Sequence, residues 1–144
     1  YFLPTENLNN AIITAALAGI KVELMLPRRT DSRLTTYAAC SYLEQLLEAG
    51  VRVFFYDRGF LHSKLLIVDD RVSTIGSANM DFRSLEHNFE ISGFVYDEGT
   101  ARRLHTLFDQ DKQACSELTI SEWSKRGRLE RFAESVMRLF APLL

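Results

Sequence analysis

The residues of this sequence best suited to chemistry run from His62 to Glu90. His62 and Lys64 stand two positions apart at the start of an apolar run, and Ser77 and Asn79 stand two apart just after the next one. Side chains of a β-strand alternate between its faces, so the members of each pair should point the same way. Glu90 opens a third strand-like run that could lie alongside. The pattern predicts one shared site for these five side chains.

These residue types together suit attack on a phosphorus centre. A histidine is a nucleophile or general acid near neutral pH, and a carboxylate bonded to its second ring nitrogen fixes its tautomer. A lysine and two neutral donors match the oxygens of a phosphodiester, whose charge must be held in the transition state. A single polar residue at a strand end is common and needs no such explanation. The whole set favours a phosphodiester site that needs no metal if the histidine is the nucleophile.

The elements that would hold this site alternate along the chain. Apolar spacing predicts helices over residues 5–19, 37–50, 98–114 and much of 121–141, and strands over 20–27, 51–57, 62–70, 71–77 and 88–97. This alternation predicts an α/β fold with a mixed, largely parallel β-sheet flanked by helices on both faces. We expect a catalytic half over residues 1–115 and a C-terminal helical extension over 116–144 that packs on it.

Composition narrows the class of protein. The 144 residues are 47% hydrophobic and 25% charged, which fits one globular domain. A net charge of -2 weighs against a dedicated nucleic-acid binder. The three histidines lack metal-ligand spacing, so we expect no metal site. The longest apolar run is far below the roughly 20 residues of a membrane span. Because the chain opens without Met, at what resembles the end of a strand, we expect further sequence upstream of Tyr1.

The motif itself is recognisable. The spacing His62-x-Lys64-x4-Asp69-x6-Gly76-Ser77-x-Asn79 resembles the HKD signature of the phospholipase D superfamily. Longer stretches, from the loop after Pro27 to the terminal FAPLL, are similar to the C-terminal half of bacterial cardiolipin synthases. The resemblance therefore covers essentially the whole chain.

The resemblance implies a role for each matching residue. His62 would be one of a pair of active-site histidines, with Lys64 and Asn79 holding phosphate oxygens and Ser77 supporting them. Glu90 falls where the family places an acid that bonds the catalytic histidine, so we expect a hydrogen bond of about 2.6–3.2 Å between Glu90 and His62.

Three further residues lie in or near the motif, and two of them have alternative roles. Asp69 would be structural, since its strand parity is opposite to that of His62 and Lys64 and should turn it out of the pocket. Arg83 could shape the pocket loop by pairing with Asp81, or could bind a lipid phosphate. Phe60 could pack in the core or line the mouth of the site.

One motif supplies half of a family active site, because members combine two HKD motifs. The other half would lie elsewhere in the parent chain or in a second copy. The implied reaction moves a phosphatidyl group between two phosphatidylglycerol molecules through a phosphohistidine, and needs no cofactor. The alternatives are a phospholipase D or homodimeric phosphodiesterase or endonuclease of the superfamily, and a phosphate-binding half that is inactive alone.

The resemblance also implies partners and a place in the cell. The expected partners are an anionic phospholipid and the second HKD half, with nucleic acid disfavoured. The whole protein would work at the bacterial inner (cytoplasmic) membrane, and this segment by itself is expected to be soluble, without a transmembrane segment.

Overall fold

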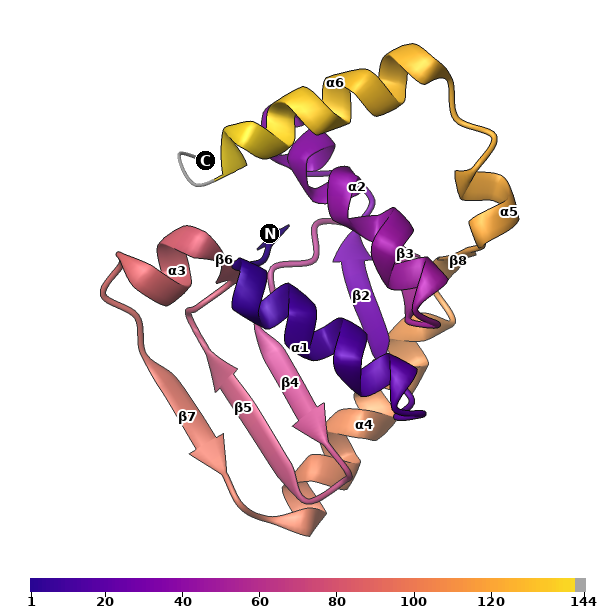
Figure 1. Cartoon of the computed structure of the whole chain (residues 1–144). Helices are drawn as coiled ribbons and strands as arrows, with labels where there is room; N and C mark the ends of the chain where they lie inside the picture. The colour runs from indigo at the N-terminus through magenta and orange to yellow at the C-terminus, as the bar shows by residue number, and fades with distance from the viewer. Residues whose placement is uncertain (142–144) are drawn as a thin grey trace.

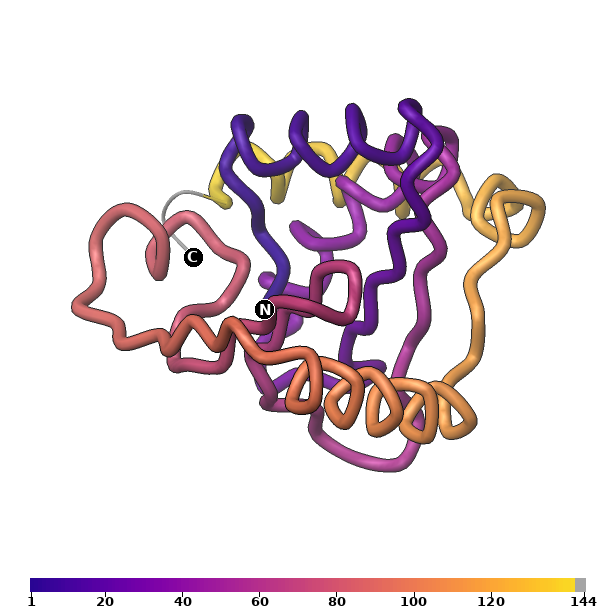
Figure 2. Tube along the Cα trace, turned by 90° about the horizontal axis from the view of Figure 1, so that it is seen from below, coloured from indigo at the N-terminus to yellow at the C-terminus, as the bar shows by residue number. Residues whose placement is uncertain are grey.

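The computed structural model describes residues 1–141, and its helices lie on both sides of the strands. The helices are α1 (Glu6–Leu17), α2 (Arg33–Glu48), α3 (Phe82–Glu86), α4 (Glu98–Lys112), α5 (Ile120–Trp123) and α6 (Arg128–Leu139). Helices α1, α2 and α6 lie on one side, and α4 lies on the other (Figure 2). The predicted α/β class with flanking helices is therefore confirmed.

The strands fall into three hydrogen-bonded groups. They are β1 (Phe2–Leu3), β2 (Glu23–Pro27), β3 (Arg52–Tyr56), β4 (Leu65–Val68), β5 (Val72–Gly76), β6 (Met80–Asp81), β7 (Ser92–Val95) and β8 (Cys115–Leu118). The groups run in the orders β1-β6, β2-β3-β8 and β4-β5-β7 (Figure 1). Strand β1 is parallel to β6, and β2 is parallel to β3, across the crossover helix α2.

The strand pairing is mixed, and it includes fewer parallel pairs than the sequence predicted. Within residues 1–141, three of the five strand pairs are antiparallel: β3-β8, β4-β5 and β5-β7. The reason for β4-β5 is local. Asp69 and Asp70 both have positive φ, of 50° and 53°, which Asp tolerates better than most residues, and the Arg71 N–H closes the turn on the Val68 carbonyl at 3.0 Å. A tight turn of this kind forces neighbouring strands to run antiparallel.

The main core forms between α2 and the β2-β3-β8 group. Leu43, Leu46 and Val53 are fully buried there. Helix α2 begins at Arg33, four residues before the predicted start at residue 37, because Ser32 caps it by accepting a hydrogen bond from Thr35 N. Gly50, at φ 92°, follows its C-terminal end, where only glycine adopts this backbone freely.

The C-terminal segment attaches to the same core. Strand β8 pairs with β3, and α6 packs along α2, on the outer side of the molecule (Figure 1). Because β8 spans residue 115, the strand pairing continues across the predicted division of the chain, which stays a prediction. Among the helices described, none has both the length and the apolar character needed to cross a membrane.

Candidate active site

His62 and Lys64 lie just before β4, outside regular secondary structure, because β4 is shorter than the strand predicted over 62–70. The segment still follows β5, because the Gly76 N–H donates to the Lys64 carbonyl at 3.3 Å. Lys64 Nζ donates to the carbonyl of His62 at 2.9 Å. The His62 ring is exposed and stacks on Phe60, with centroids 5.5 Å apart and planes at 24°. Phe60 thus lies beside the motif histidine, 53% exposed, instead of in the core.

Gly76 lets two backbones meet beside the motif. A Cβ atom on Gly76 would stand 2.4 Å from the Ile91 carbonyl oxygen, so no side chain fits there. The close approach lets the Ser77 N–H donate to that carbonyl at 2.9 Å, while the Ile91 N–H donates to Ser77 Oγ at 3.0 Å. The glycine of the motif therefore fixes Ser77 against the segment that carries Glu90.

Glu90 is held by neutral donors. Its carboxylate accepts a hydrogen bond from Ser77 Oγ and another, of 3.2 Å, from Asn88 Nδ2. The Ser77 bond is the main cause that lowers the pKa of Glu90 below its ordinary 4.5, with Asn88 second and the charge of Lys64 contributing. The carboxylate therefore stays ionised at neutral pH and lies within electrostatic reach of Lys64.

The expected hydrogen bond from Glu90 to His62 is not among those that the structure shows over residues 1–141. Strand β7 begins at Ser92, so Glu90 lies in the loop before it and not on the strand predicted over 88–97. From that loop its carboxylate turns to Ser77 and Asn88. Asn88 was not predicted as a site residue, and its place two positions before Glu90 was the only signal for it.

Asn79 is positioned by a long-range strand pair. It directly precedes β6, and the pairing of Phe2 with Met80 brings the start of the described chain beside it. The Tyr1 nitrogen donates to Asn79 Oδ1 at 3.5 Å and is close enough to Lys64 to feel its charge. Asn79 and Lys64 therefore both lie near the Tyr1 nitrogen.

Asp69 lies apart from these residues. It sits in the turn at the far end of β4 from His62. Its neighbour Asp70 contacts His105 on α4, with Oδ1 and Nδ1 2.5 Å apart, which ties the turn to that helix. The position of Asp69 fits the structural role proposed for it.

Arg83 and His87 belong to the loop that leads towards Glu90. Arg83 is exposed on α3, whose N-terminus is capped by Asp81 through a 2.7 Å hydrogen bond from Ser84 N. The His87 ring meets Phe82 edge to face, with centroids 5.1 Å apart. A substrate-binding role for Arg83 remains a prediction.

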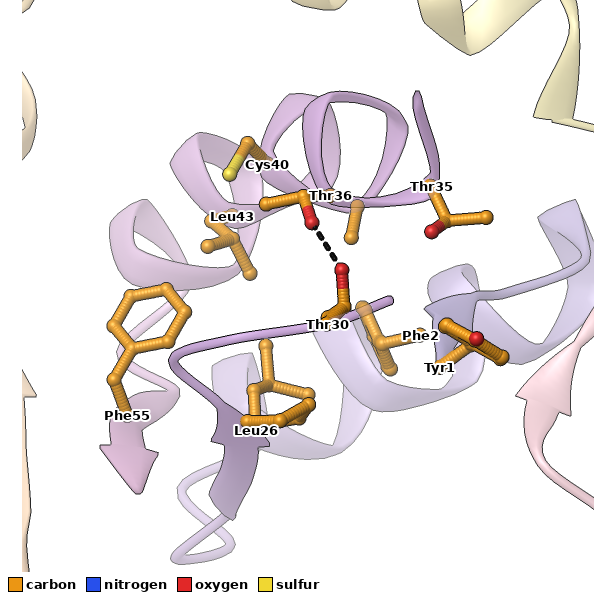
Figure 3. A pocket seen from close by; sticks show the side chains of 11 residues that line it. Tyr1, Phe2, Leu26, Thr30, Thr35, Thr36, Cys40, Leu43 and Phe55 are labelled. Carbon is orange, nitrogen blue, oxygen red and sulfur yellow. Dashed lines mark hydrogen bonds between the residues drawn. The ribbon is translucent and has the colours of Figure 1, made fainter. Parts of the chain in front are cut away.

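A small apolar cavity adjoins Tyr1, whose backbone nitrogen bonds Asn79 (Figure 3). It encloses about 30 Å³ and is lined by residues of β1, β2, β3 and α2, with Tyr1 at one end and Phe55 at the other. Thr30 and Thr36 are hydrogen-bonded across it at 2.6 Å. Burial raises the pKa of the Cys40 thiol in its wall to about 12, which keeps that thiol protonated and unreactive. The cavity is too small for a lipid chain.

The geometry places a cation, an anion and neutral polar groups at one end of the β4-β5 hairpin, beside an exposed imidazole. Lys64 and Asn79 can hold phosphate oxygens, and Ser77 links the motif strand to Glu90. Across residues 1–141 no group of three or more His, Cys, Asp and Glu side chains is placed to hold a metal ion. The arrangement can bind an anionic phosphate beside a potential nucleophile.

The chain is similar in sequence to known proteins. The family described as "Cardiolipin synthase, PLD-like domain" matches residues 1–112. Cardiolipin synthase 2 of Staphylococcus epidermidis is 44% identical over all 144 residues, which make up 30% of its length, and cardiolipin synthase 2 of Bacillus anthracis is 44% identical over 28% of its length. The chain therefore spans less than a third of these relatives.

Solved structures share the fold. Nuc, a phospholipase D family member from Salmonella typhimurium, superposes with a TM-score of 0.73 at 16% identity over 83% of this chain and 78% of its own. Phosphatidylserine synthase of Haemophilus influenzae gives a TM-score of 0.70 at 19% identity, over 99% of this chain and 38% of its own. At these identities the likeness establishes the fold alone.

Proposed function

The chain belongs to the family of cardiolipin synthase PLD-like domains, and from that premise we propose that it is one HKD half of a phosphatidyltransferase. The reaction would join two phosphatidylglycerol molecules into cardiolipin and release glycerol. The observation that supports this most is the motif with its full spacing, whose Lys64, Ser77 and Asn79 gather at one end of a hairpin beside His62.

Each motif residue has a defined part in the proposed reaction. A ring nitrogen of His62 attacks phosphorus, so that a P–N bond forms as the P–O bond to glycerol breaks. Lys64 and Asn79 hold the phosphate oxygens as charge develops on them. A histidine of the second half protonates the departing glycerol oxygen and then takes the proton of the acceptor hydroxyl, whose oxygen displaces His62. Ser77 and the ionised Glu90 fix the strand ends around this centre.

An exposed apolar sheet face supports the need for a second half. Strand pairing puts Leu66 and Phe94 on one face of the β4-β5-β7 group, together with Val68 and Tyr96. These side chains are 43%, 64%, 45% and 78% exposed, in that order. By strand parity Lys64 belongs to the same face. Monomers seldom leave such a face open, so we propose that the other HKD half covers it and completes the site.

The test is transfer activity on phosphatidylglycerol vesicles, with cardiolipin and glycerol measured together in the full-length protein. His62→Ala should abolish both products, and an acid-labile phosphoprotein should form only when His62 is present. His87→Ala is the matched control, because His87 is exposed and outside the motif, and it should keep most of the activity. Full transfer by His62→Ala would refute the assignment.

The 144-residue chain alone gives a second test. One histidine cannot attack phosphorus and protonate the leaving group in the same step, so the chain should show little or no turnover while remaining folded. Turnover equal to the full-length protein by a monomer would contradict the two-half proposal. Turnover by a dimer would identify the second half as another copy.

A further inference from the structure

Helix α6 packs Met137 against the core, but it also buries a carboxylate there and leaves several large apolar side chains on its exposed side. Glu134 is only 5% exposed and forms an ion pair with Arg126, whose side chain is 12% exposed. In contrast, Leu129 is 86% exposed, Phe132 68% and Leu139 78%. A surface helix normally turns its apolar stripe to the core.

The outward residues form one continuous stripe. Leu129, Phe132 and Leu139 recur at spacings of three and seven, which places them on one face of the helix, and Phe140, the residue that caps its C-terminal end, is 48% exposed. We call these four residues the outer stripe. Over 12 residues the helix is about 18 Å long, so the stripe is a long ridge and not a scattered set of side chains.

The polar contacts of α6 hold this orientation in place. Arg131 Nη2 donates to both carboxylate oxygens of Glu44 on α2, at 2.8 and 3.0 Å. The Arg138 guanidinium lies over the Tyr42 ring, 4.4 Å from its centroid. Rolling the helix to bury the stripe would break these contacts and the Arg126–Glu134 pair. The exposed stripe is therefore a fixed feature of the fold.

The segment around the stripe is basic. Residues 120–141 hold five basic and three acidic side chains, a net charge of +2, whereas the chain as a whole carries -2. Lys125 and Arg128 are exposed next to the start of the stripe. An apolar ridge bordered by Lys and Arg complements an anionic lipid surface, since aliphatic stems can lie along the apolar layer while the charged ends reach the headgroups.

We propose that α6 lies on the surface of a membrane that contains anionic phospholipid, with the outer stripe inserted between headgroups and acyl chains. Figure 1 shows α6 at the outer edge of the molecule, beyond α2, where a flat surface can reach it. The binding does not depend on the proposed transfer reaction, because it can be measured without turnover. A loss of catalysis and a loss of membrane binding are therefore separate results.

The test is flotation of the 144-residue chain with vesicles of phosphatidylglycerol and phosphatidylcholine, and with phosphatidylcholine alone. We expect binding to the anionic vesicles and at least about a tenfold loss of that binding in the double variant Phe132→Ser, Leu139→Ser. Leu17→Ser, Ile20→Ser is the matched control, because these α1 residues are 70% and 58% exposed but lie off the stripe. It should bind like the parent chain.

Charge gives an independent arm of the same experiment. Lys125→Gln with Arg128→Gln should weaken binding to anionic vesicles several-fold, and the difference should shrink as salt rises. The proposal fails if the parent chain does not float with anionic vesicles, or if the stripe variant floats as well as the parent. It also fails if sedimentation shows a dimer that the stripe variant dissociates, because the stripe would then bind a second copy. Circular dichroism verifies that each variant is folded.

Discussion

The two three-stranded groups of this protein differ in how far their apolar side chains are buried. The β2-β3-β8 group buries Val53 completely beneath α2, whose Leu43 and Leu46 are equally buried. The β4-β5-β7 group contacts α4 on one face and leaves Phe94 and Tyr96 64% and 78% exposed on the other. Both groups have similar strand lengths and residue types, so the contrast lies in what covers them. We call β2-β3-β8 the closed group and β4-β5-β7 the open group.

Charges show the same contrast. In the closed group Glu23, whose side chain is 9% exposed, pairs with Lys21, Arg52 and Lys112. Burial alone would raise the pKa of Glu23, but Lys112 and Lys21 outweigh it and lower the pKa. In the open group Glu90 relies on neutral donors at an exposed site. The closed group therefore carries the stability of the fold, and the open group carries groups that a ligand can still reach.

The largest expected effect tests the closed group. Leu43→Ala should lower the free energy of unfolding by about 2–5 kcal/mol, because it removes a fully buried side chain and leaves a cavity in the core. Phe94→Ala is the counterpart in the open group, and it should change the free energy of unfolding by less than about 0.5 kcal/mol. Urea denaturation of the chain measures both. Equal losses would show that the open face is packed in solution.

The next effect tests the open group. Lys64→Met in the full-length protein should lower kcat and kcat/KM of the proposed transfer by roughly a hundredfold, because the ammonium would stabilise charge that develops in the transition state. Its unfolding midpoint should stay near that of the parent. Lys21→Met, at an exposed lysine of the closed group, should leave kcat unchanged. A change confined to KM for Lys64→Met would indicate ground-state binding instead.

The order of the elements, and the places of the motif residues along them, could be predicted because they depend on local signals. Thr5 caps α1, Gly50 ends α2, and the motif spacing marks His62 and Lys64 within a few residues. These features follow from neighbours in sequence, which periodicity and turn chemistry record.

The features of the fold and site that could not be predicted depend on contacts between segments that are distant in sequence, which no local pattern records. The pairing of β1 with β6 places Asn79 beside the start of the chain, and the pairing of β8 with β3 adds an antiparallel edge. The partner of Glu90 was mistaken because it depends on where β7 begins. The outward face of α6 also could not be predicted, because the sequence shows an amphipathic helix but not which side of it packs against the fold.

A smaller effect tests the close approach inside the open group. Gly76→Ala should destabilise the fold by about 1–3 kcal/mol, because its Cβ would stand 2.4 Å from the Ile91 carbonyl and force the two strands apart. Gly59→Ala is the control, since a Cβ there meets nothing within 4 Å. Thermal unfolding compares the two. A Gly76→Ala chain as stable as the control would mean that β5 and β7 separate easily.

The smallest effect concerns the charge of Glu90. Its folded pKa lies below 4.5, so its ionised form stabilises the folded chain above pH 4.5, and that contribution is lost as pH falls through the lower, folded pKa. Glu90→Gln should therefore flatten the fall of the unfolding free energy in this acid window, by a small amount because the carboxylate is exposed. Ser77→Ala removes the largest cause of the shift, so carboxyl NMR should show the pKa of Glu90 rising towards 4.5. In the double variant Ser77→Ala, Glu90→Gln, the acid dependence should match that of Glu90→Gln alone. A Glu90 pKa that Ser77→Ala leaves in place would show that the Ser77 hydrogen bond does not set it, and would shift that role to Asn88, Ser84 or Lys64.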